Sequence, residues 1–415
     1  MIISIVHLKM PTVYPTSGVY LVSMTRMKMS AAAQLPVRFI PGDEGRKPEK
    51  GMALCLSGGG YRAMLFHVGS LWRLNELGLL PQLKRISCVS GGSITGAFLG
   101  LQWNALRFNT RGTAENFEEI VVTPLRKFAR KTIDIPDVVK GVALHGTISE
   151  YVESSYRALF GTKTLQDFPD ERFAPHVVIN ASNVQTTAIW RFSRPYMADY
   201  RVGTIASPRT PLAFVVAASS AFPPFLSPAV LRLNPSDITT DPTCDLQYPP
   251  YTRSAVLCDG GAYDNLGLET CWKRYKTILV SDACAPLGPY PQPKRDWPRQ
   301  TYRLLFLIQN EVQAVRKYQL IDSYIQRLRT GAYWGIASDV SHYPLRNRLR
   351  VPLAWSTALA NVPTRLAAMS PALQESLINW GYAITDTSVR SHAMDYLPRP
   401  VSRSQFPYER NAPEV

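Results

Sequence analysis

Short apolar runs that resemble buried strands alternate with amphipathic segments along most of the chain. Runs of this kind, rich in β-branched and other apolar residues, lie at 52–56, 85–89, 177–179 and 277–280. Strands buried on both faces read as continuous apolar runs because neither face meets water, as in parallel sheets. Helical spacing of apolar positions follows the first two runs, at 62–77 and 92–103. The pattern predicts an α/β fold built on parallel strands with helices between them.

A longer amphipathic pattern lies further along the chain, around 308–328. Its apolar positions are Ile308, Val312, Val315, Ile321, Ile325 and Leu328. A helix that packs on the core and a helix that faces lipid would share this spacing. We expect core packing for this helix.

The first apolar run leads directly into a glycine-rich turn that contains Gly58, Gly59, Gly60 and Arg62. Glycines allow backbone N–H groups to point toward one centre, the following helix contributes the positive end of its dipole, and Arg62 adds a charge. The turn therefore suits an anion, either a bound phosphate or an oxyanion that forms during acyl transfer. The loop lacks the Lys-Ser/Thr pair of a Walker loop and the G-x-G-x-x-G of a dinucleotide site. A second element of the sequence is therefore needed to choose between a phosphate and an oxyanion.

The second apolar run ends on Ser90, which stands between small residues. A nucleophilic serine on a tight strand-to-helix turn needs small residues two positions before and after it, and for Ser90 these are Cys88 and Gly92. Ser93 is the weaker candidate because Thr95, two positions later, is β-branched. Both serines could instead merely cap the helix. We expect Ser90 to be the nucleophile.

A carboxylate in a third glycine turn is the candidate general base. Asp259 follows the apolar run 255–257 and precedes Gly260 and Gly261. A partly desolvated carboxylate within reach of a serine can take its proton without a histidine. Asp259 could instead form only an Asx-turn.

Histidine is the commoner base, yet none of the six histidines of this chain stands in a catalytic motif. His67 lies on the expected helix 62–77, where a role in the core is the better interpretation. His342 and His392 come late in the chain, so that the order serine, acid, histidine remains formally open.

Together the three turns resemble the patatin-like phospholipases, whose pattern is a G-G-G-x-R/K loop, a G-x-S-x-G elbow and a D-G-G/A turn in that order. The matching residues are Gly58, Gly59, Gly60 and Arg62 in the loop, Ser90 and Gly92 in the elbow, and Asp259, Gly260 and Gly261 in the turn. The motifs span roughly 52–275, and segments at 331–336 and 379–382 look like those of a bacterial subgroup. The resemblance implies a three-layer α/β/α sandwich with a mainly parallel central sheet and a helical C-terminal extension.

The resemblance also implies a serine lipid acyl hydrolase of the phospholipase A or lysophospholipase type, a carboxylic ester hydrolase that uses no metal or other cofactor. Asp259 would take the proton of Ser90 as the serine attacks an ester carbonyl. The N–H groups of the glycine loop would hold the oxyanion, with Arg62 stiffening or polarising the loop. Support of the elbow and of the acid turn is expected from Cys88, Gly92, Gly260 and Gly261.

Cys88 departs from the family pattern, because it stands where the elbow has its first glycine. Its β-carbon and sulfur would strain or widen the elbow at the contact between strand and helix. A catalytically impaired lipid-binding protein is therefore one alternative function. A histidine-dependent esterase of the α/β-hydrolase kind is the other.

Charge and composition bound the partners and the compartment. The 415 residues carry a formal net charge of +15, yet show no zinc-finger spacing, RNP-like motif or dense basic stripe, which argues against nucleic acid. Solubility alone or attraction to anionic lipid headgroups would explain the charge. We expect a phospholipid or other acyl-lipid substrate and peripheral contact with a membrane, since no segment is long and apolar enough to cross one. Six cysteines without a disulfide pattern favour the cytoplasm.

Four segments are expected along the chain. Residues 1–50 form an N-terminal extension and linker, partly disordered, and 52–275 form the catalytic core. Residues 276–395 add the last strand of the sheet and a helical part of the same domain. The tail 396–415, rich in Pro, Arg and Ser, is expected to be disordered.

Overall fold

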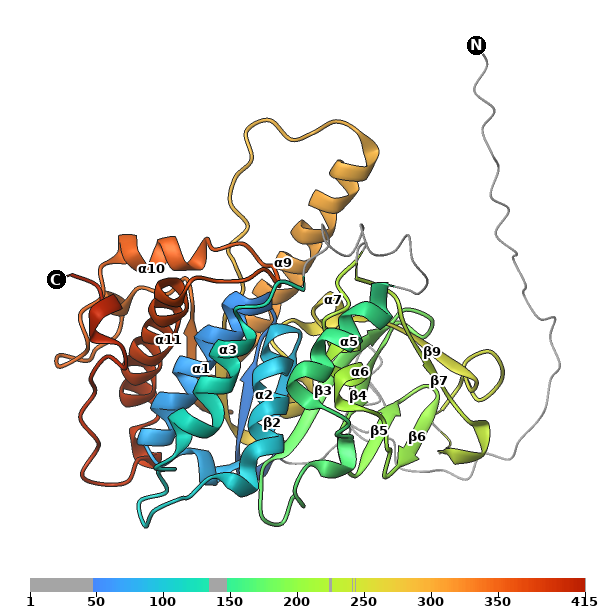
Figure 1. Ribbon diagram of the computed structural model, residues 1–415, viewed down its shortest axis with the longest axis horizontal. Coiled ribbons are helices and arrows are strands. Elements are labelled where there is room, and N and C mark those ends of the chain that lie inside the picture. Colours follow the sequence, from blue (N-terminus) through green and yellow to red (C-terminus); the bar gives the residue numbers. More distant parts are fainter. Residues whose placement is uncertain (1–47, 134–147, 224–225, 241, 243, 415) are drawn as a thin grey trace. The chain divides into compact units, whose positions relative to one another are not determined.

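The computed structural model describes residues 48–133, 148–223, 226–240, 242 and 244–414. The expected N-terminal extension therefore lies almost entirely outside the described residues. The described part folds around one mixed sheet with helices on both faces (Figure 1).

The sheet is parallel in its centre and antiparallel beyond β3. The parallel strands follow one another in the order β11-β10-β1-β2-β3. The antiparallel partners are β4 and β9 beside β3, β7 beside β9, and β5, β6 and β8 further out. The strands are β1 Glu49–Leu56, β2 Leu83–Val89, β3 His176–Asn183, β4 Ala188–Phe192, β5 Tyr196–Asp199, β6 Gly203–Ala206, β7 Ala229–Arg232, β8 Ile238–Thr239, β9 Ser254–Asp259, β10 Tyr275–Asp282 and β11 Thr330–Gly335. The predicted α/β fold with a mainly parallel central sheet is confirmed, and its four expected strands are β1, β2, β3 and β10.

One parallel strand was not expected. The sequence predicted that the run within β10 would be the last strand of the sheet, but β11 follows it and pairs with it in parallel. Its residues, Thr-Gly-Ala-Tyr-Trp-Gly, contain no Val, Ile or Leu. The strand is therefore invisible to a search for apolar runs.

Helices cover the two faces of the sheet because side chains of each strand alternate between them. On β1, Leu54 and Leu56 belong to a large core cluster with α1 and α11, whereas Ala53 and Cys55 belong to a smaller one beside α8. The helices of the described residues are α1 Gly60–Glu76, α2 Gly91–Gln102, α3 Thr123–Phe128, α5 Ile148–Phe160, α6 Leu212–Ser219, α7 Gly261–Asp264, α8 Glu269–Trp272, α9 Trp297–Ile325, α10 Leu353–Ala360 and α11 Pro371–His392. The expected three-layer α/β/α arrangement, with helices in the C-terminal part, is confirmed.

Helices α1 and α11 pack against each other at two glycines. A β-carbon on Gly69 would lie 1.9 Å from the Ile378 carbonyl oxygen, and one on Gly381 would lie 1.9 Å from the Phe66 carbonyl oxygen. No other residue allows the two backbones to approach this closely. The contact fixes the C-terminal helix beside the helix that follows the glycine loop.

The described part of the C-terminal tail, 396–414, packs against these two helices, which corrects the expectation of disorder for 396–415. Arg410 donates to the buried Glu375 carboxylate of α11. The Arg73 guanidinium of α1 donates to the Ser402 carbonyl at 2.7 Å, and the Tyr408 ring lies beside Trp72. Buried charged side chains of the helices thus find their partners in the tail, which composition alone does not reveal.

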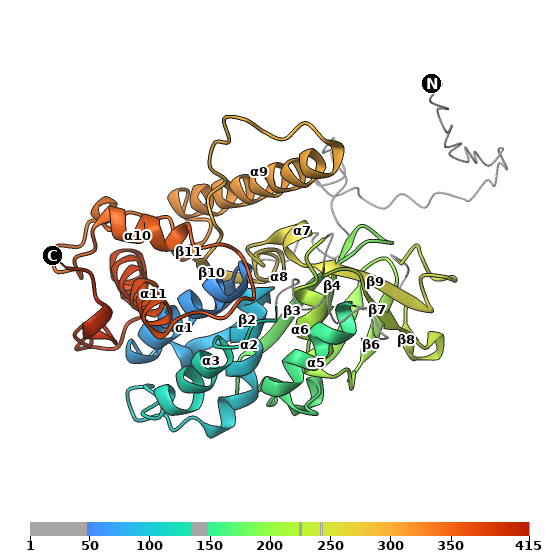
Figure 2. The ribbon, with the colours of Figure 1, turned by 45° about the horizontal axis from the view of Figure 1, so that its top comes forward.

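The long amphipathic helix exists as α9, but the expectation that it packs on the core is wrong for most of its length. It begins at Trp297, earlier than predicted, and ends at Ile325. Among its residues only Leu320 and Ser323 are buried, whereas Ile308 and Val315 are 59% and 63% exposed. Figure 2 shows α9 running along the outside of the fold, with the loop before it arching away.

Candidate active site

The three predicted turns meet at one edge of the sheet. The glycine loop follows β1 and Ser90 follows β2, so both lie at the carboxyl ends of neighbouring parallel strands. This edge is where open α/β sheets bind ligands. Asp259 reaches it from the end of β9, which pairs antiparallel with β3. All three elements line one cavity of about 1150 Å³.

Ser90 occupies a strained turn between β2 and α2. Its φ of 51° with ψ of −121° lies in a region that residues other than glycine rarely adopt. The Ser219 hydroxyl supports the turn by accepting from the Ser90 N–H at 3.0 Å and donating to the Asn180 carbonyl at 2.7 Å. Ser90 faces the cavity, whereas the rival Ser93 is fully buried and lies 2.8 Å from the Ser219 hydroxyl. Of these two serines, Ser90 is the one that lines the cavity.

Asp259 is a buried carboxylate with two hydrogen-bond donors. Its Oδ1 accepts from the Gly261 N–H at 2.7 Å, which is the Asx-turn considered from the sequence, and the Ser90 side chain also hydrogen-bonds to it. Both bonds favour the ionised form, but burial outweighs them and raises the pKa of Asp259 from 3.8 to about 6. The Asx-turn and the contact with Ser90 therefore coexist.

None of the four histidines in the described residues lines this cavity. His67 is a buried core residue, as expected, and its ring nitrogens lie 2.9 Å from the Ser57 carbonyl oxygen and 2.8 Å from the Ser281 hydroxyl. Burial lowers the pKa of His67 to about 4, so the ring is neutral. His342 and His392 are exposed. The contact that Ser90 makes is with a carboxylate.

The glycine loop presents fewer free donors than expected. The Gly58 N–H donates to the Asn265 carbonyl at 3.1 Å, which corrects the expectation that it is available to an oxyanion. The N–H groups of Gly59 and Gly60 have no acceptor among the described residues, and their φ values of 140° and 61° favour glycine. The N–H of Gly91 is equally free. Sequence reasoning missed Gly91, although the residue after a nucleophile commonly contributes to an oxyanion hole.

Arg62 lies beside the glycine loop in the cavity lining, and its guanidinium is held by carbonyls of two distant segments. Its Nε and Nη2 donate to the Ala283 carbonyl at 3.2 and 2.9 Å, and its Nη1 donates to the Val362 carbonyl. Burial lowers its pKa to about 10, so it remains charged at neutral pH. Of the two roles considered for Arg62, the contacts favour stiffening of the loop over polarising it.

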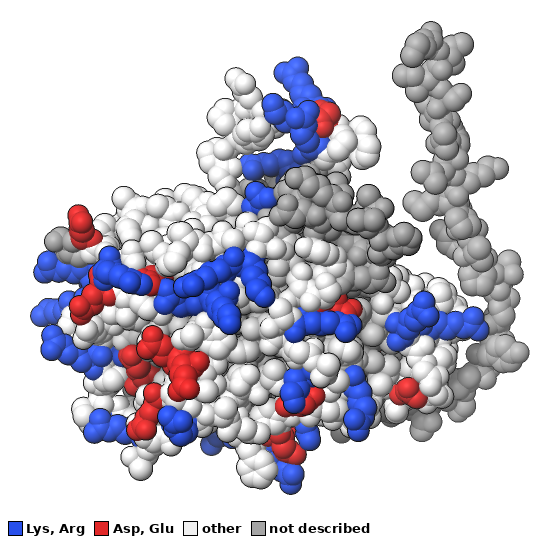
Figure 3. All heavy atoms as spheres, viewed as in Figure 1, with Lys and Arg blue, Asp and Glu red and all other residues white. Residues whose placement is uncertain are grey.

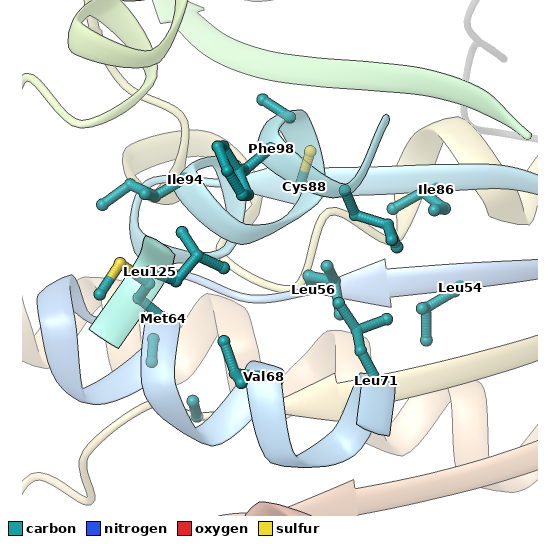
Figure 4. Close-up of a cluster of buried hydrophobic side chains, with 14 of the residues drawn as sticks. Leu54, Leu56, Met64, Val68, Leu71, Ile86, Cys88, Ile94, Phe98 and Leu125 are labelled. Carbon is teal, nitrogen blue, oxygen red and sulfur yellow. The ribbon is translucent and has the colours of Figure 1, made fainter. Parts of the chain in front are cut away.

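Cys88 contacts α2 at Gly96 and not at Gly92. Its side chain points into the apolar cluster beside Ile86 and Phe98 (Figure 4). It packs against Gly96 of α2, where an added β-carbon would lie 2.9 Å from the Cys88 sulfur. Gly92 instead faces β1, where an added β-carbon would lie 2.4 Å from the Leu56 carbonyl oxygen. Because Gly96 has no side chain, it leaves room for the Cys88 side chain between β2 and α2.

Replacing Cys88 by Gly should therefore weaken the fold and leave turnover per folded molecule unchanged. The substitution leaves a void beside Gly96 and loosens β2, at a cost of about 1–3 kcal/mol. Denaturant unfolding measures this loss, and Cys244→Ala, at a half-exposed loop position, is the control that should change stability by less than about 0.5 kcal/mol. A gain in activity for Cys88→Gly at unchanged stability would contradict this account of the elbow.

Helix α9 and the loop before it form one wall of the cavity. The Phe306 ring of α9 lies 5.4 Å from Phe222 and 4.8 Å from Tyr302, centre to centre. Basic side chains line the cavity nearby, namely Lys294, Arg299 and Arg303. The cavity thus combines an apolar wall with a positively charged rim, and Asp259 is the one acidic residue in its lining among the described residues.

The residues that the structure describes contain neither a membrane-spanning helix nor a cluster of metal-binding side chains. Across them, no helix combines the length and apolarity needed to cross a bilayer. No group of three or more His, Cys, Asp or Glu side chains within them is arranged to hold a metal ion.

The chain is similar to several solved structures at low sequence identity. Human GIVD cytosolic phospholipase A2 is 14% identical, with a TM-score of 0.49 over 86% of this chain and 63% of that one. Its complex with methyl gamma-linolenyl fluorophosphonate is 16% identical, with a TM-score of 0.47 over 86% and 59%. VipD from Legionella pneumophila is 15% identical, with a TM-score of 0.34 over 83% and 67%. This chain thus spans less than two thirds of the human enzyme, and no curated protein matches it in sequence.

A family model gives the direct assignment. The model of the patatin-like phospholipases, a family of lipid acyl hydrolases, matches residues 54–272. The match covers more than half of the 415 residues and includes all three turns that line the cavity. The chain belongs to the patatin-like phospholipase family.

Proposed function

We propose that this protein is a serine lipid acyl hydrolase that cleaves fatty-acyl esters through a dyad of Ser90 and Asp259. The observation that carries the proposal is the contact between a serine on a strained turn and a desolvated carboxylate, inside a large and partly apolar cavity. A carboxylate with a pKa near 6 is ionised at neutral pH and still basic enough to accept a proton. Membership of the family supports the same chemistry.

The mechanism follows from the positions of the donors and of the base. The Ser90 oxygen attacks the ester carbonyl while Asp259 takes its proton, and the carbonyl oxygen becomes an oxyanion. The free N–H groups of Gly59, Gly60 and Gly91 are the donors that would stabilise it. Collapse of this intermediate releases the alcohol with the proton from Asp259, and water then hydrolyses the acyl-serine by the same steps.

Phospholipid or lysophospholipid is the substrate class that the cavity suits best. Phe222, Tyr302 and Phe306 offer an apolar wall for an acyl chain, and Lys294 and Arg303 offer positive charge for a phosphate. Incubation with a mixed phospholipid extract, with Ser90→Ala as the blank, tests the proposal. Serine-dependent release of free fatty acid supports it, and transfer of the acyl chain to an acceptor lipid would indicate a transacylase. Unchanged lipids with both proteins would refute it.

The role of Arg62 is open to a direct test, because lysine keeps the charge but cannot reach two carbonyls with a planar fork. Arg62→Lys should lower kcat by on the order of tenfold to a hundredfold through a displaced oxyanion loop. Arg73→Lys is the matched control on the same helix, since its contacts with Asp386 and Ser402 lie outside the cavity lining. This control should lose stability and keep kcat. Full activity of Arg62→Lys would mean that charge alone is needed.

A further inference from the structure

Helix α9 turns its polar side toward the protein and its apolar side away from it. Gln309 donates to the Gly261 carbonyl at 3.0 Å, Gln313 donates to both Asp282 oxygens at 3.0 Å, and the Tyr324 hydroxyl donates to the Ile278 carbonyl at 2.6 Å. Arg316 forms ion pairs with Asp264 and Glu269. These polar contacts attach the helix together with Leu320, the aliphatic side chain of α9 that is buried in the smaller core cluster.

The opposite side of α9 carries a stripe of exposed large apolar side chains. Their spacing of three, four or seven residues places them on one helical face. We call this the outer face of α9, and it comprises Trp297 (78% exposed), Leu304 (49%), Ile308 (59%), Val315 (63%), Tyr318 (77%) and Ile325 (75%). Single exposed apolar residues are ordinary, but a stripe along a helix of 29 residues marks an interaction surface.

The outer face is continuous with the mouth of the cavity. Tyr302 and Phe306, on the inner side of the same helix, line the cavity, and so do Lys294 and Arg303 at its N-terminal end. Figure 3 shows Lys and Arg side chains gathered around this projecting end of α9. A membrane carrying anionic lipids would contact aliphatic and aromatic side chains through its acyl region and the basic ones through its headgroups.

We propose that the outer face of α9 and the basic rim of the cavity dock on an anionic lipid bilayer, so that the cavity opens onto the membrane. The exposed Glu311 and Asp322 lie on the same side of α9 and restrict the helix to the headgroup region. That the molecule entering the cavity is a lipid rests on the proposed function. The docking itself is independent of catalysis.

A second copy of this chain fits the outer face less well. The basic rim beside the outer face, formed by Lys294, Arg299 and Arg303, is opposite in charge to anionic headgroups. A second copy would bring a rim of the same charge, which repels the first.

Vesicle flotation of the full-length Ser90→Ala protein tests docking without hydrolysis. Partitioning onto phosphatidylcholine vesicles containing phosphatidylglycerol should exceed that onto phosphatidylcholine alone, and added salt should weaken it. Adding Ile308→Ser and Val315→Ser should reduce partitioning on the order of a hundredfold. The matched control replaces Phe173 and Val230, which are 77% and 51% exposed on other elements, and should change partitioning by less than about twofold.

Two results would overturn docking by α9. One is equal partitioning of the Ile308→Ser/Val315→Ser protein and its control, with unchanged circular dichroism. The other is sedimentation of the lipid-free parent as a dimer that the same two substitutions convert to a monomer, with partitioning unaffected. A third result would separate the two proposals. If the wild-type protein bound vesicles containing phosphatidylglycerol but released no fatty acid, the proposed hydrolysis would be refuted and docking would stand.

Discussion

Ser90→Ala is expected to lose ester hydrolysis by on the order of 10⁴-fold or more in kcat, because the substitution removes the cavity-lining hydroxyl that hydrogen-bonds to the Asp259 carboxylate. The substitution leaves the backbone conformation of residue 90 unchanged, so the protein should still fold. Hydrolysis of a soluble short-chain ester measures the loss without dependence on a membrane.

Ser93→Ala is the control for that loss, three residues along the same helix start. The Ser93 hydroxyl is buried against Ser219, so its removal should cost about 1–3 kcal/mol of stability. Because Ser93 lies outside the cavity lining, activity per folded molecule should fall by less than about tenfold. If Ser93→Ala lost far more activity per folded molecule than Ser90→Ala, Ser93 would be the nucleophile.

Asp259→Asn should lose activity on the order of 10⁴-fold, since the amide cannot accept the Ser90 proton while its oxygen can still accept from the Gly261 N–H. In the wild-type protein the base must be ionised. The kcat of the wild-type protein should therefore rise with pH through about 6 and become constant above it. A pH–rate profile on the soluble ester checks both points, and a rise centred near 7 that Asp259→Asn left in place would point to a histidine.

The same variant should gain stability, and the sign follows from the raised pKa. Between the unfolded pKa of 3.8 and the folded pKa of about 6, the folded state binds the proton that the unfolded state has lost. The contribution of Asp259 to wild-type stability therefore falls as pH rises through this range, by about 3 kcal/mol. Asparagine carries no charge, so burying it does not lower stability in this way. In denaturant unfolding, Asp259→Asn should have a larger free energy of unfolding than wild type at pH 8 and a similar one near pH 4. Equal stability at pH 8 would contradict a desolvated carboxylate.

Much of the architecture could be predicted because buried parallel strands leave uninterrupted apolar runs, as in β1 and β2. Strand β11 could not be predicted, because Gly331 and Gly335 interrupt its apolar residues. Its pairing with β10, which the sequence does not reveal, stabilises it as a strand. The tail was misjudged for a related reason. Its arginine and serine residues look solvated in sequence, but Arg410 and Ser402 meet buried charges on α11 and α1.

The residues of the candidate site could be predicted because each of its three turns is marked by residues next to it in the sequence. Ser90, Asp259 and the glycine loop are each marked by their own neighbours, and the sheet brings them together. Their hydrogen-bond partners come from distant segments, which the sequence does not reveal. Asn265 removes Gly58 as a donor, Ala283 engages Arg62, and Gly96 makes room for Cys88. The direction of α9 was missed because spacing defines an apolar face but not which way it points.

Covalent labelling by a fluorophosphonate tests the central claim, the activation of Ser90 by Asp259, most directly. Folded wild-type protein should acquire one phosphonyl group on the peptide that contains Ser90, as mass spectrometry would show. Asp259→Asn should be labelled far more slowly, and Ser93→Ala at close to the wild-type rate. An adduct on another residue, or a folded wild-type protein that stays unlabelled, would contradict the account.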